Sequence, residues 1–229
     1  MDLVFMAAFP EPLRAILYDL DGTLADSFLP IRESFNHILR EFGHSRVLSH
    51  EESLALVGGG LEESVARLLS PGEVSRGTAA FRAHYETIFL ETTHPMPGAD
   101  TLLREMFRRG VSQGVVTNKL GTSARALIRH FGWDDLLPIC LGEHDGYELK
   151  PSPDMLLAAA GQMGVAPRDL LFVGDSPFDR EAGRRAGCPV ILLTTGTHQE
   201  KELAALDPLV VLKSLSDVEK WVRESGRVR

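Results

Sequence analysis

Two carboxylates stand close together in the segment YDLDGT, residues 18 to 23, directly after an apolar run. If that run is a strand, alternation places Asp19 and Asp21 on the same side of it, where two like charges held close together destabilise the fold. A divalent cation and a phosphate group would compensate this cost. An aspartate can attack phosphorus as a nucleophile, and a second carboxyl can then transfer the proton.

Three further polar segments have comparable places in the sequence: TNK at 117–119, KPSP at 150–153 and GDSPFD at 174–179. The first and third end apolar runs, and the second lies between an apolar run and a helical pattern. Ligands of open α/β sheets bind beyond the carboxyl ends of the strands. We therefore expect the four segments to meet at one edge of a sheet.

Each segment alone also has a purely structural explanation. Residues 21–23 suit a turn, 117–118 can end a strand and cap a helix, Lys150 can be a solvated surface charge, and 175–176 can cap the next helix. A calcium loop starting at Asp19 is excluded because its glycine position holds leucine. The coincidence of all four segments at one edge favours a shared site.

The expected chemistry is phosphoryl transfer assisted by Mg²⁺, which is usually held by one or two carboxylates together with waters and substrate phosphate. We predict that Asp19, Asp175 and the backbone carbonyl of Asp21 hold this ion. Asp179 and Ser176 are expected one layer behind, where they orient the ligands.

Donors are needed for the charge on the transferring oxygens, and Lys150 and the Thr117 hydroxyl can supply them. Asn118 and Gly22 are further candidates for binding the phosphate. Lys119 is expected to add positive potential at the rim of the site.

Short apolar runs predict the strands that carry these segments, and from residue 98 they alternate with helical patterns. Such alternation predicts an α/β fold with a parallel sheet covered on both sides. The strands are expected at 15–20, 114–117, 138–142, 170–174 and 190–194, with 209–212 as a candidate sixth.

Residues 28–92 break this alternation and contain helical stripes without a convincing strand, including the capping box SHEE at 49–52. We predict an all-helical cap at 28–92, inserted into a catalytic core formed by 1–27 and 93–229. An insertion beside a candidate site is placed to act as a lid.

Bulk composition is that of a globular protein, with 44% hydrophobic and 24% charged residues. The net charge of -8 argues against nucleic acid and anionic membranes as partners. Only two cysteines occur, at 140 and 188, which favours the cytoplasm. The first residues lack a basic region and are broken by prolines, so no signal peptide is expected, and Met6 is a second candidate start.

DLDGT, Thr117, Lys150 and GDSPFD occur in the order typical of one family. In them the chain resembles the phosphatases of the haloacid dehalogenase superfamily, and the resemblance covers nearly the whole sequence. It implies a Rossmann-like three-layer α/β/α core, an inserted helical cap and Mg²⁺ as cofactor. Asp19 would be the nucleophile, Asp21 the acid and base, Thr117 and Lys150 the stabilisers of phosphate and charge, and Asp175 a metal ligand.

Within the superfamily, GVVTNK, KPSP, LLFVGDSPFD and RAGCPVILLTTG look most like phosphoglycolate phosphatase and its near relatives. The dehalogenases lack a carboxyl at the position of Asp21, which therefore indicates phosphate chemistry. The family's cap loop reaches toward the substrate where this chain has GGG at 58–60, so Gly59 is a candidate binding residue. These glycines could equally be a flexible connection between helices.

The leading hypothesis is an Mg²⁺-dependent phosphatase that hydrolyses a small phosphorylated metabolite, first phosphoglycolate, through an aspartyl-phosphate. The alternatives are a pyrophosphatase, a sugar-phosphate phosphatase, a phosphosugar mutase of the same superfamily, or a non-catalytic phosphate-binding regulator. The residues leave open whether the chain is a monomer or a homodimer.

Overall fold

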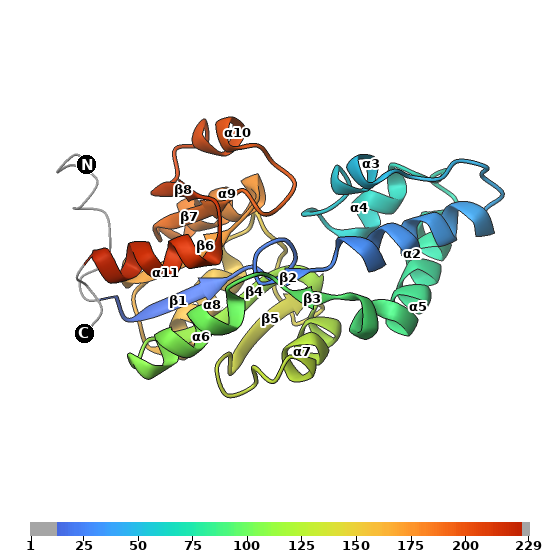
Figure 1. Cartoon of the computed structure of the whole chain (residues 1–229). Helices are drawn as coiled ribbons and strands as arrows, with labels where there is room; N and C mark the ends of the chain where they lie inside the picture. Colours follow the sequence, from blue (N-terminus) through green and yellow to red (C-terminus); the bar gives the residue numbers. More distant parts are fainter. Residues whose placement is uncertain (1–12, 226–229) are drawn as a thin grey trace.

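A parallel six-stranded sheet forms the centre of the computed structural model, which describes residues 13–225 (Figure 1). The predictions about a signal peptide and the start at Met6 fall outside the described residues. The strand order is β5-β4-β1-β6-β7-β8. The strands are β1 (Ala15–Tyr18), β4 (Ser112–Leu120), β5 (Ile139–Glu143), β6 (Leu170–Gly174), β7 (Val190–Leu193) and β8 (Val210–Leu212).

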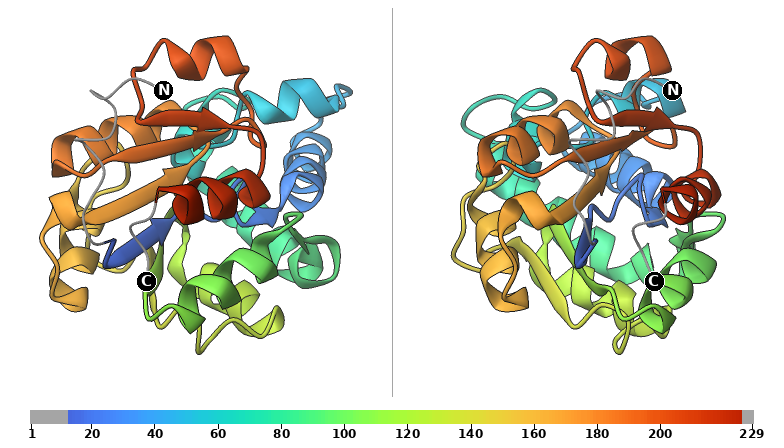
Figure 2. Two further views of the ribbon diagram at one scale, coloured as in Figure 1. Left: turned by 60° about the vertical axis from the view of Figure 1, so that its left-hand side comes forward. Right: turned by 90° about the vertical axis from the view of Figure 1, so that its left-hand side faces the viewer.

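Helices cover both faces of this sheet because its strands are apolar on both sides (Figures 1 and 2). Ile16 and Tyr18 of β1 join one buried cluster, whereas Ala15 and Leu17 join another. One face is covered by α6 (Ala99–Arg108), α7 (Gly121–His130) and α11 (Leu215–Glu224). The other is covered by α8 (Asp154–Met163), α9 (Pro177–Ala186) and α10 (Glu200–Ala204), with the short helix η1 (Pro167–Asp169) before β6. The predicted three-layer core is confirmed.

β1 occupies the position where the strand order reverses, between β4 and β6. In this doubly wound arrangement the crevice beside such a strand is the usual ligand site. The strand ends at Tyr18, so Asp19 is the first residue past it, and its backbone N–H donates to the Val173 carbonyl at 2.9 Å. The fold therefore places the paired aspartates at its switch point.

Residues between Phe28 and Thr92 fold into helices that lie beside the carboxyl edge of the sheet (Figure 1). Phe35 and Phe81 pack at their centre, with ring centroids 4.7 Å apart. The predicted capping box is present, since Ser49 accepts from the backbone N–H of Glu52 and Glu52 accepts from that of Ser49. We propose these helices as the cap domain. They are α2 (Phe28–Glu41), α3 (His50–Leu54), α4 (Leu61–Ala66) and α5 (Val74–Thr92).

The two connections between core and cap pair with each other, which the sequence did not predict. β2 (Ala25–Asp26) and β3 (His94–Pro95) form a short antiparallel pair, and the backbone N–H of Met96 donates to the Leu24 carbonyl at 2.8 Å. Among residues 13–225, no helix is both long enough and apolar enough to cross a membrane.

Candidate active site

Asp19 is buried at the base of a cavity between the sheet edge and the cap helices, with 8% of its surface exposed. Its Oδ1 accepts from the backbone N–H of Leu20 at 2.7 Å and lies 2.8 Å from the Lys150 Nζ. These two contacts fix the direction of the carboxylate. Its position at the end of a buried strand makes Asp19 a rigidly held group.

Lys150 enters the same site from the loop between β5 and α8. Its Nζ lies 2.7 Å from Asp179 Oδ1 and donates to the Val116 carbonyl at 3.1 Å. Burial alone would lower the pKa of this ammonium, but the Asp179 and Asp19 carboxylates outweigh it and raise the pKa. Lys150 is therefore a fixed positive charge beside Asp19, rather than a solvated surface residue.

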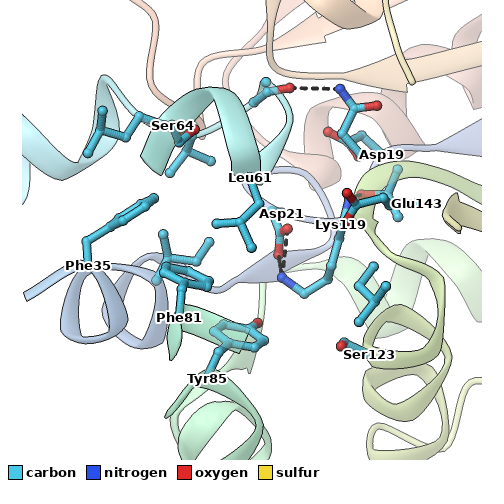
Figure 3. Close-up of a pocket in the computed structure, with 18 of the residues that line it drawn as sticks. Asp19, Asp21, Phe35, Leu61, Ser64, Phe81, Tyr85, Lys119, Ser123 and Glu143 are labelled. Atoms are coloured by element: carbon cyan, nitrogen blue, oxygen red, sulfur yellow. Dashed lines mark hydrogen bonds and ion pairs between the residues drawn. The ribbon is translucent and has the colours of Figure 1, made fainter. Parts of the chain in front are cut away.

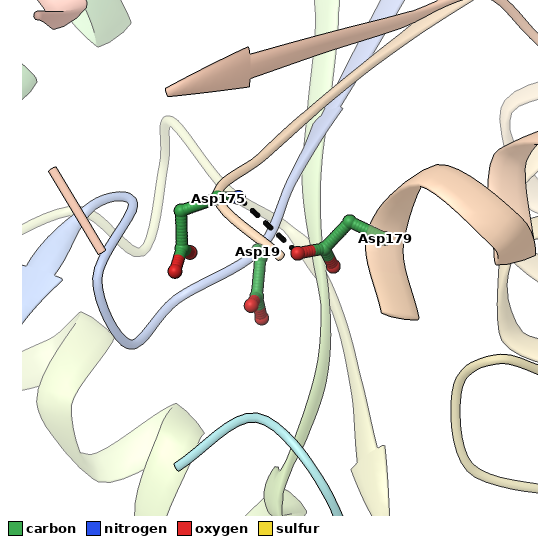
Figure 4. A group of neighbouring side chains, drawn as sticks. All are labelled: Asp19, Asp175 and Asp179. Carbon is green, nitrogen blue, oxygen red and sulfur yellow. Dashed lines mark hydrogen bonds between the residues drawn. The ribbon is translucent and has the colours of Figure 1, made fainter. Parts of the chain in front are cut away.

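Asp175, the first residue after β6, lies across from Asp19 (Figure 4). Its Oδ1 accepts from the Thr23 hydroxyl at 2.7 Å. Two glycines leave room for its other oxygen, because a Cβ on Gly22 would lie 2.7 Å from Asp175 Oδ2 and one on Gly196 would lie 1.8 Å from it. Gly22 also has φ +82°, a conformation that favours glycine. These distances do not concern phosphate, so binding of phosphate by Gly22 stays a prediction.

Asp179 and Ser176 form a capping box at the start of α9. Asp179 Oδ2 accepts from the backbone N–H groups of Asp175 and Ser176, at 3.2 and 3.0 Å, and from the Ser176 hydroxyl at 2.5 Å. Its Oδ1 accepts from Lys150. Since protein donors engage both oxygens, Asp179 orients Lys150 and Asp175.

A hard cation fits the oxygen atoms gathered at this point. Carboxylate oxygens of Asp19, Asp175 and Asp179 lie within 4.8 Å of one another, and all three residues are buried (Figure 4). An all-oxygen donor set suits Mg²⁺ and does not suit softer metals. Because Asp179 is already engaged, Asp19 and Asp175 are the side chains best placed to hold a metal. The carboxylate of Asp21 does not belong to this group, and the use of its backbone carbonyl stays a prediction.

Charge balance also favours a divalent cation here. The site gathers four carboxylates and two ammonium groups: Asp19, Asp21, Asp175, Asp179, Lys119 and Lys150. Burial raises the pKa of Asp19 to about 6, against the attraction of Lys150 and with added repulsion from Asp179. Burial also raises the pKa of Asp175, again with repulsion from Asp179 and Asp19. The side chains of the site by themselves thus carry excess negative charge, which a cation would offset.

The Asp21 carboxylate is engaged by Lys119, which is not at the rim as predicted. The Lys119 Nζ donates to both oxygens of Asp21, at 2.9 and 2.8 Å, and only 7% of its side chain is exposed (Figure 3). It also lies 4.7 Å from the ring centroid of Tyr85 in α5. The rim assignment was wrong because β4 continues to Leu120 and carries Lys119 inward over Asp21.

Thr117 is buried at the cavity wall, and its hydroxyl accepts from the backbone N–H of Lys119 at 3.2 Å. The side chain of the predicted phosphate ligand Asn118 has other partners. Its Oδ1 accepts from the backbone N–H of Lys150 at 2.7 Å, and its Nδ2 donates to the carbonyls of Lys150 and Gly58, at 2.9 and 3.0 Å. The amide group of Asn118 is therefore committed to the backbone.

The cap contributes the apolar side of the cavity (Figure 3). Gly58 and Gly59 line it, which favours the interpretation of GGG as a loop that reaches the site over that of a free connection. Contact between Gly59 and substrate stays a prediction. Arg82 of α5 also lines the cavity and pairs with Glu143 of β5 at 2.8 Å. The apolar lining residues of the cap are Ile31, Phe35, Leu56, Val57, Leu61 and Phe81.

Comparisons with known proteins show the family to which this fold belongs. The model of the haloacid dehalogenase-like hydrolase family matches residues 16–193. Phosphoglycolate phosphatase of Rhodospirillum rubrum is 31% identical over 220 residues, covering 91% of this chain and 90% of that protein. The solved structure of a predicted phosphoglycolate phosphatase from Haemophilus somnus is 26% identical with a TM-score of 0.82, covering 91% of this chain and 97% of that one. CbbY from Rhodobacter sphaeroides, solved in complex with phosphate, is 26% identical with a TM-score of 0.76, covering 90% and 96%. The chain belongs to the haloacid dehalogenase-like hydrolases, and within them to the phosphoglycolate phosphatase-like phosphatases.

Proposed function

We propose that the chain hydrolyses a small phosphorylated metabolite through an aspartyl-phosphate on Asp19, with Mg²⁺ as cofactor. The observation that carries the proposal is the buried Asp19 carboxylate, held 2.8 Å from Lys150 and beside Asp175 at the base of the cavity. A nucleophile fixed in this way loses little orientational freedom when the substrate phosphorus approaches.

In the first step an Asp19 oxygen forms a bond to phosphorus while the bond to the ester oxygen breaks. Asp21 gives its proton to that leaving oxygen. Water then attacks the phosphorus of the aspartyl-phosphate, Asp21 takes its proton, and inorganic phosphate leaves with Asp19 restored. Lys150 and Thr117 provide charge and a hydrogen bond for the phosphoryl oxygens.

The ion pair between Asp21 and Lys119 adds a condition to this scheme. Lys119 holds both oxygens of Asp21, so the carboxyl cannot donate a proton to substrate in the same position. We infer that an anionic substrate draws Lys119 toward itself and releases Asp21. Lys119 then pairs with the negative charge that enters the cavity.

Asp19, Asp175 and the Asp21 backbone carbonyl would hold Mg²⁺. When bound, it neutralises phosphoryl charge and fixes the phosphate beside Asp19.

Phosphoglycolate is the first substrate we propose, because relatives covering nearly the whole chain bear the name of that activity. Two cationic side chains among the described residues line the cavity, Lys119 and Arg82. Either could meet the carboxylate of a small phosphorylated acid. The phosphate found in the CbbY structure supports a phosphate site in this fold.

The proposed location is the cytoplasm. Cys140 and Cys188 are both free in the structure, and burial raises the pKa of each thiol to about 12. Thiols of this kind are unreactive and do not form a disulfide framework.

Asp19→Asn tests the function directly. Substitution keeps the size of the side chain and removes the nucleophile, so we expect Mg²⁺-dependent kcat/KM to fall by roughly 10³-fold or more on phosphoglycolate and on an aryl phosphate. The fall in kcat/KM is measured by steady-state kinetics on a panel of phosphorylated metabolites, with Mg²⁺ and with EDTA. An Asp19→Asn protein that retains wild-type Mg²⁺-dependent hydrolysis would contradict the proposal.

A further inference from the structure

Asn118 joins the loop that carries Lys150 to a loop of the cap. Its side-chain amide makes two hydrogen bonds to the Lys150 backbone. Oδ1 accepts from the Lys150 N–H at 2.7 Å, and Nδ2 donates to the Lys150 carbonyl at 2.9 Å. Lys150 stands in an irregular loop between β5 and α8, where no neighbouring strand fixes its backbone. The Asn118 side chain therefore supplies hydrogen bonds that a sheet would otherwise provide.

The same amide nitrogen also donates to the Gly58 carbonyl at 3.0 Å. An amide nitrogen has two hydrogens, so the carbonyls of Lys150 and Gly58 together use both. Gly58 has φ +105°, and a Cβ there would lie 3.4 Å from Phe178, the residue before Asp179. The cap loop thus lies against the core at Asn118 and at Phe178. Asn118 binds the backbone of Lys150, and Phe178 precedes Asp179, which accepts from the Lys150 ammonium.

We propose that Asn118 is a positioning residue that couples seating of the cap loop at 56–60 to the placement of Lys150. This inference rests on the proposed function, because it assigns Lys150 to the phosphoryl site. While the loop is seated, the Asn118 nitrogen is held between two carbonyls and its oxygen is aimed at the Lys150 N–H. When the loop lifts, that nitrogen loses one partner and the amide can rotate. Lys150 is then held less firmly beside Asp19.

The test combines kinetics with amide hydrogen exchange resolved by residue. In Asn118→Ala we expect kcat to fall by roughly 10²-fold with little change in KM, because displacement of a catalytic group affects the chemical step. The amides of 56–60 and of Lys150 should exchange faster together, while those of α8 keep their wild-type rates.

Asn118→Asp separates the two halves of the coupling. A carboxylate keeps an acceptor for the Lys150 N–H but has no hydrogen for the two carbonyls. We expect faster exchange at 56–60, a Lys150 amide closer to its wild-type rate than in Asn118→Ala, and a kcat between those of the alanine variant and the wild type. This variant also serves if Asn118→Ala fails to fold.

Ser123→Ala is the matched control. It removes a different contact between core and cap, the hydrogen bond from the Ser123 hydroxyl of α7 to Glu86 of α5, and both partners lie outside the Lys150 loop. We expect the Lys150 amide to keep its wild-type exchange rate. The inference is overturned if Ser123→Ala speeds exchange at Lys150 as much as Asn118→Ala does. It is also overturned if Asn118→Ala leaves kcat within about twofold, or leaves exchange at 56–60 unchanged.

Failure of this inference can be told apart from failure of the proposed function. If the wild-type protein hydrolyses no phosphate ester, the function fails, and hydrogen exchange alone still decides whether 56–60 and Lys150 move together. If hydrolysis is normal and the two segments exchange independently, only the inference fails.

Discussion

At the scale of single residues, two neighbouring carboxylates have different environments. Asp19 is fixed by the Leu20 N–H and by Lys150, at the base of the cavity. Asp21 is turned toward Lys119, whose Nζ lies over the ring of Tyr85 in the cap (Figure 3). This division fits one carboxylate that attacks phosphorus and holds metal, and another that transfers a proton. Paired groups with different surroundings commonly take different catalytic roles.

Asp21→Ala separates these roles. We expect kcat to fall by about 10²- to 10⁴-fold, the usual contribution of a general acid and base. Mg²⁺ affinity, measured by calorimetry, should change little, because the backbone carbonyl at position 21 is kept. Asp21→Asn controls for the loss of volume. A large loss of Mg²⁺ affinity, or a kcat close to that of the wild type, would contradict the assignment.

At the scale of elements, the turn after β1 determines how close Asp175 can come to Asp19. Gly22 has φ +82°, and a Cβ there would meet Asp175 Oδ2 at 2.7 Å. The turn is further held by the Thr195 hydroxyl, which donates to the Gly22 carbonyl at 2.7 Å. A glycine at this turn therefore serves the proposed metal site as well as the backbone conformation.

Gly22→Ala should weaken Mg²⁺ binding and turnover together, because the added methyl displaces the Asp175 carboxylate. Gly43→Ala is a matched control, since Gly43 also has positive φ, +78°, with nothing within 4 Å of the added Cβ. Both variants should lose stability from backbone strain. Thermal unfolding, calorimetry and kinetics measure the difference. Equal effects of the two variants on Mg²⁺ affinity would show that Asp175 is not displaced.

The sheet, and the meeting of the four polar segments at its edge, could be predicted because the strands are short apolar runs and each segment follows one. Local pattern also predicted the capping box at Ser49. The pair of β2 and β3 was missed because two-residue strands have no detectable period. The partner of Lys119 was missed because Asp21 lies far away along the chain, and only the register of β4 beside β1 brings them together. The partners of the Asn118 amide were missed for the same reason, since they are set by tertiary structure. Binding of phosphate by Asn118 stays a prediction.

At the scale of the whole molecule, we expect the buried carboxylates to make the free energy of unfolding depend on pH and on bound Mg²⁺. Burial raises the pKa of Asp19 from its ordinary value of 3.8 to about 6. Between pH 3.8 and about pH 6, Asp19 therefore keeps its proton in the folded state and has lost it in the unfolded state. The free energy of unfolding therefore falls as pH rises through this window.

Mg²⁺ should reverse this loss, because it binds the ionised carboxylates. We expect Mg²⁺ to raise Tm more at about pH 7.5 than at about pH 5, where protons compete for Asp19. The rise in Tm is measured by thermal unfolding with Mg²⁺ and with EDTA at both pH values. Asp175→Asn should make this rise smaller. An equal or larger rise in Tm at the lower pH would contradict the assignment of these carboxylates to a cation site.

Covalent phosphorylation of Asp19 is the central claim, and trapping the intermediate tests it most directly. Turnover of phosphoglycolate or an aryl phosphate with Mg²⁺ is stopped with acid, which preserves acyl phosphates, and the digested protein is analysed by mass spectrometry. We predict a phosphoryl group on the peptide containing Asp19, absent in Asp19→Asn and after EDTA. Rapid turnover with no phosphoryl group on that peptide, or with one on a different residue, would contradict the account.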